Sequence, residues 1–126
     1  MIKTIFTESG KEIKLSNAAA FLYIYKNQFG KEPLKDIAEL TKAFQNQEEE
    51  LDQMELMKRF DLEVLYNLAW SLAKTADRKT EEPMDFYLKY DDFKPLDHAL
   101  DIINLALSSL TGSFEVEDSQ EQSEKN

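Results

Sequence analysis

LEVLYNLAWSLAKTA, at residues 62–76, is the stretch that decides the fold of this chain. At helical spacing its clearly polar side chains fall on one narrow stripe, and apolar side chains cover the rest of the circumference. The polar stripe consists of Glu63, Asn67, Ser71, Lys74 and Thr75. A helix that is apolar over most of its surface must be enclosed by other elements. We therefore predict a central helix over 62–76, with Trp70 buried.

Two segments resemble a known family. LAWSLAKTAD at 68–77 and MDFYLKYDDF at 84–93 are similar to the phage tail assembly chaperones of Gram-positive siphophages and prophages. Members are small acidic proteins with a leucine–alanine–tryptophan–x–x–alanine–lysine–x–alanine–asparagine/aspartate helix, a short aromatic helix ending in phenylalanine, and a last amphipathic helix. The matching positions here are Leu68, Ala69, Trp70, Ala73, Lys74, Ala76, Asp77, Phe86, Leu88 and Phe93.

This resemblance covers 61–110 well and 16–30 more loosely. It departs from the family at Tyr87, where many relatives carry tryptophan, and its shared positions are packing residues without a chemical signature. The resemblance implies that the chain binds and solubilises the tape-measure protein, a very long helical polypeptide, during tail morphogenesis. It leaves the tail tube protein open as a second partner. It also implies a place in the host cytoplasm during assembly and absence from the mature virion.

The first fifteen residues predict a β-hairpin. Ile13 and Leu15 alternate with charged residues, and they follow the turn Glu8-Ser9-Gly10-Lys11, where glycine supplies a positive φ. A lone hairpin is marginal in water, so this one must pack on the helices or pair with another chain. Self-association is therefore open.

Helical spacing predicts further helices on both sides of 62–76. Ser16 or Asn17 is placed to cap the first helix, and Gly30 ends it. The second helix starts at Pro33 and is expected to turn inward Leu34, Ile37, Ala38, Thr41 and Phe44. A short aromatic helix should run from 84 to about 90. A last helix over 95–110 should turn inward Ala99, Ile102, Ile103, Ala106, Leu107 and Leu110, with Gly112 ending it.

These elements define a mainly α fold, with a small N-terminal β-hairpin followed by a compact bundle of about five helices. We place it as a single domain at 1–112. From Glu115 onward the sequence lacks any apolar run, so we expect 113–126 to be an acidic disordered tail.

Composition limits the function classes. The 126 residues contain no cysteine, which suits a reducing cytoplasm and excludes disulfides and thiolate metal sites. A net charge of −10 argues against direct nucleic-acid binding and favours a basic protein partner, although the charge could serve solubility alone. The start of the chain lacks the apolar segment of a signal peptide, and the apolar stretches of the chain are too short to span a bilayer. We therefore expect a soluble protein that does not bind a membrane.

Residues for catalysis are scarce in this sequence. His98 is the only histidine, so no histidine pair exists to bind a metal or to activate a nucleophile, and the three glycines stand alone. We therefore expect no enzyme activity, cofactor or metal. An acidic DNA mimic or an inhibitor of a nucleic-acid enzyme remains the alternative function, and it would need carboxylates arrayed over an ordered surface.

Aromatic residues are the candidates for partner binding. Phe86, Tyr87, Tyr90 and Phe93 are spaced so that one short helix and its end cannot bury every ring against a small core. Aromatic side chains are frequent interface anchors, and we add Trp70 of the family-like motif to this set. The alternative is that the aromatic helix simply covers the core.

Overall fold

The computed structural model describes residues 1–45, 54, 58 and 61–111. It confirms a mainly α fold with an N-terminal two-stranded hairpin, and five α-helices lie within the described residues. The elements in chain order are β1 (Ile2–Phe6), β2 (Glu12–Ser16), α1 (Ala20–Phe29), α2 (Pro33–Gln45), α4 (Leu62–Ala76), α5 (Pro83–Lys89), the 3₁₀ helix η1 (Pro95–His98) and α6 (Ala99–Thr111). The predicted tail at 113–126 lies outside the described residues.

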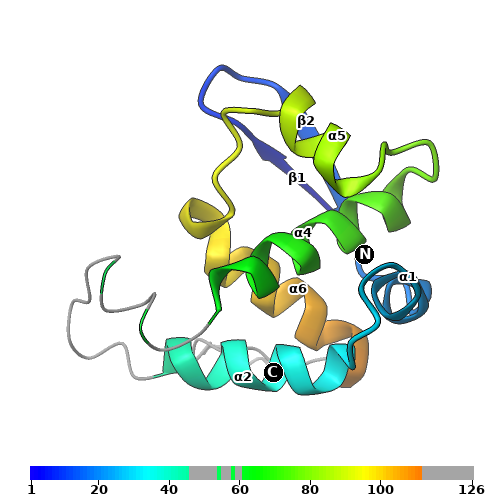
Figure 1. The fold of residues 1–126 in the computed structure, drawn as a ribbon, viewed down its shortest axis with the longest axis vertical. Helices are drawn as coiled ribbons and strands as arrows, with labels where there is room; N and C mark the ends of the chain where they lie inside the picture. The colour runs from blue at the N-terminus through cyan, green and yellow to red at the C-terminus, as the bar shows by residue number, and fades with distance from the viewer. Residues whose placement is uncertain (46–53, 55–57, 59–60, 112–126) are drawn as a thin grey trace, which may run out of the picture.

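Helix α4 is the centre of the fold, as its sequence predicts. It packs against α1, α2, α5, α6, η1 and strand β2, and Figure 1 shows it crossing the molecule with α5 and the hairpin on one side and α2 on the other. Asp61 caps its start by accepting a hydrogen bond from the Glu63 N–H at 3.0 Å, and the helix ends at Ala76. The predicted bounds of this helix are therefore confirmed.

The polar stripe of α4 is partly enclosed as well. Asn67 and Ser71 are buried with the apolar residues around them. The Ser71 hydroxyl donates to the Asn67 carbonyl oxygen at 2.9 Å, and the Thr75 hydroxyl donates to the Ser71 carbonyl at 2.7 Å. Hydroxyls that bond back to the preceding turn are satisfied without water, so α4 can be surrounded on this side too.

The hairpin has the predicted inward side. Strands β1 and β2 pair antiparallel from Ile2–Ser16 to Phe6–Glu12, and Gly10 has a φ of 91° in the turn between them. Ile13 and Leu15 are buried, since β2 packs on α4. The turn is also bonded to the segment after α5, where the Ser9 N–H donates to Asp92 at 2.7 Å. The hairpin thus packs on the helices.

The predicted cap of the first helix is wrong. Helix α1 begins at Ala20 with Ala19 as its N-cap, and Ser16 belongs to β2. The Asn17 amide group instead donates to the Leu105 carbonyl oxygen at 3.1 Å, and its carbonyl oxygen accepts from the N-terminal amine. These long-range bonds to α6 and to the start of the chain outweigh the local capping preference.

The predicted inward face of the second helix is partly wrong. Helix α2 buries Ile37 and Phe44 as predicted, but it also buries Leu40, while Leu34 is 53% exposed and Ala38 is exposed. Helical spacing allows either stripe. Packing against α6 and a hydrogen bond of 2.5 Å from the Tyr25 hydroxyl to Asp36 select the observed one.

The last predicted helix divides into two parts. Residues Pro95–His98 form a 3₁₀ turn, and the α-helix starts at Ala99. Tight 3₁₀ turns are common at helix starts, and Pro95 stands at the first position where no N–H is needed. The predicted inward residues of α6 are buried except for Leu110, which is exposed near the end of the helix. Gly112, the predicted stop, lies outside the described residues.

Candidate functional site

The rings of the aromatic segment pack on one another. Phe86 lies 5.1 Å from Tyr90 and 6.4 Å from Phe93 between ring centroids, and Tyr87 stacks on Phe93 at 6.0 Å. Phe86 and Phe93 are buried in the core, and Tyr87 and Tyr90 are partly buried against it. Not every ring is buried in the core, as the spacing predicts, but the rings also pack on one another, so none of the four is left fully exposed. The alternative, a helix that covers the core, describes these four residues better.

Tyr87 is also held by its polar end. Its hydroxyl donates a hydrogen bond to the Tyr66 backbone carbonyl oxygen at 2.6 Å, and the two rings lie 5.1 Å apart. Burial raises the pKa of the Tyr87 hydroxyl well above its ordinary value. This side chain joins α5 to α4, and its polar tip faces the interior rather than a partner.

Trp70 lies in the core and does not reach a surface that a partner could contact. It is 2% exposed, and its indole N–H donates to the Glu81 carbonyl oxygen at 2.8 Å. Its ring meets Phe29 of α1 edge to face at 5.6 Å. The tryptophan therefore fixes the connection between α4 and α5 and the end of α1.

The apolar surface on this side comes from two residues that the sequence reasoning missed. Met84 is 76% exposed and Leu88 is 69% exposed. They stand four residues apart on α5, so they lie one above the other on the same face. A helical-wheel comparison with Phe86 would have placed them on the opposite side of the helix.

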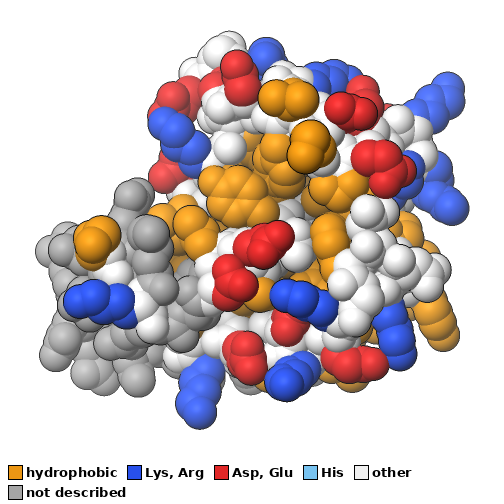
Figure 2. Space-filling model, in the orientation of Figure 1, with side chains coloured by type: hydrophobic (Ala, Val, Ile, Leu, Met, Phe, Trp, Pro, Cys, Tyr) orange, Lys and Arg blue, Asp and Glu red, His pale blue; other side chains and the backbone are white. Residues whose placement is uncertain are grey.

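Met84 and Leu88 border an open groove of about 860 Å³. Its walls come from the end of α1, the first half of α4, and α5 with its N-cap. The lining residues are Gln28, Phe29, Leu62, Glu63, Tyr66, Asn67, Glu82, Pro83, Met84, Tyr87 and Leu88. Figure 2 shows hydrophobic side chains gathered over α4 and α5, with acidic side chains beside them. We call this surface the α4–α5 groove.

The charged residues of the α4–α5 groove are both acidic. Glu63 lies at the start of α4 and Glu82 lies just before α5, and both are exposed. Within the part of the chain that the structure describes, neither carboxylate forms a salt bridge. Glu81, one residue from Glu82, is by contrast paired with Lys89 at 3.4 Å outside the groove. The groove thus combines an apolar lining with unneutralised negative charge.

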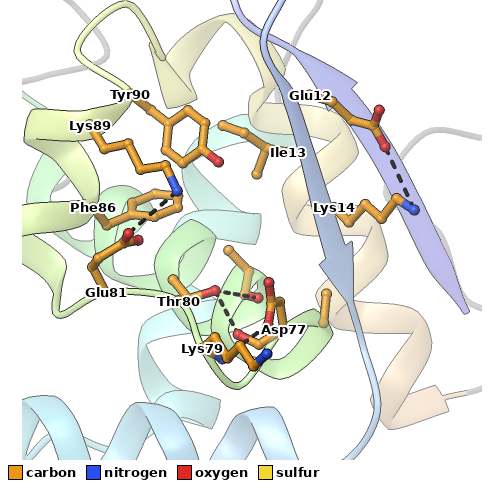
Figure 3. Close-up of a pocket in the computed structure, with 12 residues that line it drawn as sticks. Glu12, Ile13, Lys14, Asp77, Lys79, Thr80, Glu81, Phe86, Lys89 and Tyr90 are labelled. Atoms are coloured by element: carbon orange, nitrogen blue, oxygen red, sulfur yellow. Dashed lines mark hydrogen bonds and ion pairs between the residues drawn. The ribbon is translucent and has the colours of Figure 1, made fainter.

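A second pocket, of about 560 Å³, lies between β2, the 77–81 loop and α5. Figure 3 shows Ile13 of β2 beside Tyr90, the C-cap residue of α5, with Lys89 and Phe86 of α5 nearby. Its walls bond largely to one another: Thr80 donates to the Asp77 carbonyl oxygen at 2.6 Å, and Glu12 pairs with Lys14 at 3.7 Å. The Thr80 hydroxyl, which also lies within hydrogen-bond distance of the Ala73 carbonyl oxygen, holds the loop in place. The groove, with its uncovered apolar residues, is the better candidate for binding.

The described residues hold neither a metal-binding cluster nor a membrane-spanning helix. No group of three or more histidine, aspartate or glutamate side chains is placed there to hold a metal ion. His98 lies partly buried beside Phe93, with 5.9 Å between ring centroids. None of the helices described is both long enough and apolar enough to cross a bilayer.

No protein-family model, curated protein or solved structure matches this chain.

Proposed function

We propose that this protein is a phage or prophage tail assembly chaperone, which binds the tape-measure protein and keeps it in solution until the tail tube forms. The observation that carries the proposal is the α4–α5 groove. Of the two segments that resemble the family, 84–93 lines the groove with Met84, Tyr87 and Leu88, and 68–77 continues α4 beyond the part that forms another wall.

The proposed partner suits an apolar groove. A very long helical polypeptide exposes apolar faces until other protein covers them, and apolar grooves commonly receive such faces. The net charge of −10 makes chaperone molecules repel one another, so a partner coated with them resists aggregation. The protein would act in the host cytoplasm without catalysing a reaction, and it would leave before the virion matures.

Co-expression tests this function. The tape-measure protein of the same phage or prophage would be produced with and without this chain, and its soluble fraction would be measured after centrifugation. We expect the soluble fraction to rise clearly with the chain present, and the two proteins to co-elute in gel filtration. A matched control co-expresses an unrelated acidic protein of similar size, which separates specific binding from the effect of charge.

Two results would overturn the proposal. The first is a tape-measure protein that stays insoluble with the chain at equal or higher concentration. The second is recovery of the chain bound to a nuclease or another nucleic-acid enzyme, which would favour the acidic inhibitor.

A further inference from the structure

We infer that the α4–α5 groove binds a short amphipathic helix whose apolar stripe is flanked by lysine or arginine. This inference rests on the proposed function in that it takes the groove as the partner-binding surface. It adds the secondary structure and the charge of the segment that is bound.

The groove lining favours a helix over an extended strand. Every residue of the lining belongs to a helix or is the cap of one, and neither strand of the hairpin contributes. The walls therefore offer a partner side chains and helix ends, and no free strand edge. A helical partner satisfies its own backbone and needs only side-chain contact.

The spacing of the exposed apolar residues fits the same partner. Met84 and Leu88 are one helical turn apart, and the partly buried Leu62 and Tyr66 of α4 and Tyr87 of α5 line the same groove. An apolar stripe with residues at i, i+3, i+4 and i+7 presents side chains at a matching interval. Such a stripe would cover Met84 and Leu88 and complete the burial of the tyrosines.

The charge of the groove favours basic residues beside the apolar stripe of the partner helix. Glu63 and Glu82 are the charged residues of the lining, and they stand on different walls of the groove. A helix with lysine or arginine beside its apolar stripe would give each carboxylate an opposite charge. A helix with acidic flanks would bring like charges together, on a molecule that already carries −10. The groove therefore discriminates by charge as well as by shape.

Fluorescence anisotropy with labelled synthetic peptides tests the inference on the full chain. The probe is a helix-forming peptide of about 18 residues with a leucine stripe and lysine flanks. One control peptide has glutamate in place of each lysine, and another has serine in place of each leucine. We expect the lysine peptide to bind at least about tenfold more tightly than either control. Its affinity should fall as the salt concentration rises from about 50 to about 500 mM, because salt screens exposed charges.

Variants of the chain locate the binding surface. Met84→Ser combined with Leu88→Ser should lower the affinity for the lysine peptide about tenfold or more. Tyr23→Ser, which changes a 73% exposed ring of α1 outside the groove, should leave that affinity unchanged. Glu63→Gln combined with Glu82→Gln should reduce the difference in affinity between the lysine peptide and the glutamate peptide. Glu39→Gln, an exposed acid of α2 outside the groove, is the matched charge control. Far-UV circular dichroism would verify that each variant is folded.

Three results would overturn the inference: equal affinity for the lysine and glutamate peptides, full affinity in the Met84 and Leu88 variant, or a dimer of this chain that the same variant dissociates. The last would show that a second copy occupies the groove. The proposed function fails separately. If the groove binds the lysine peptide but the tape-measure protein stays insoluble, the function is wrong and the inference stands. If the Met84 and Leu88 variant still solubilises that protein, the inference is wrong and the function stands.

Discussion

Replacing Leu72 with alanine tests the enclosed position of α4 directly. Leu72 is fully buried in the middle of the helix and belongs to the core cluster. The change removes buried apolar atoms and leaves a cavity, which costs about 2–5 kcal/mol in a closed core. A domain of this size has a free energy of unfolding of about 5–15 kcal/mol, so the variant should still fold. With a urea slope of about 1–3 kcal/mol/M, the midpoint should fall by roughly 1–3 M.

The fluorescence of Trp70 provides the signal for this measurement. This residue is the one tryptophan of the chain and lies in the core, so its emission reports the exposure of the core without interference. Leu88→Ala is the matched control, because it makes the same chemical change on a helix at a site that is 69% exposed. Its free energy of unfolding should stay within about 0.5 kcal/mol of the wild type. Equal midpoints for the two variants would show that α4 is not enclosed.

Three further predictions concern contacts that tie the elements together. Trp70→Phe removes the hydrogen bond to the Glu81 carbonyl and should lower the free energy of unfolding by about 1–3 kcal/mol, measured by circular dichroism in urea; no change would mean that the bond is not formed. Asn17→Ala removes the bonds to α6 and to the N-terminus and should cost about 1–3 kcal/mol by the same method, whereas a cost near zero would contradict the tertiary role given to this amide. The Ser9 side chain and the Ser9 backbone N–H, which donates to Asp92 at 2.7 Å, hold the pKa of the Asp92 carboxyl below its ordinary value. The contribution of this carboxylate to stability is therefore complete above the ordinary pKa and is lost as the pH falls. The Asp92→Asn variant should therefore have a lower free energy of unfolding than the wild type at pH 7, and the difference between the two should become smaller below about pH 4. A difference in unfolding free energy that stays constant with pH would refute this.

The elements that the sequence predicts well are those fixed by local signals. The bounds of α4 follow from the apolar run, and Gly10 and Gly30 have the positive φ that their places in a turn and at a helix end require. Pro33 and Pro83 begin helices, as their missing N–H groups favour. Each of these signals acts within a few residues, so no knowledge of the tertiary fold is needed.

The elements that the sequence predicts poorly depend on distant neighbours. Leu34 and Leu40 both fit an amphipathic α2, and packing against α6 together with the Tyr25–Asp36 hydrogen bond decides that Leu40 is the buried one. Asn17 is a good helix cap by type, but its amide is bonded to a carbonyl 88 residues away along the chain. A local pattern does not contain such contacts, and they override it where they form.

The candidate binding residues illustrate the same limit. Phe86, Tyr87, Tyr90 and Phe93 are the conspicuous residues of their segment, yet rings at this spacing are close enough to pack on one another, and they do. Their mutual burial leaves the less conspicuous Met84 and Leu88 uncovered on the other side of α5. A polar substitution at Tyr87 would break the bond to the Tyr66 carbonyl and disturb the core, so a loss of partner binding there would report folding. The exposed pair on α5 can be changed with little effect on the core, and for that reason it separates partner binding from stability.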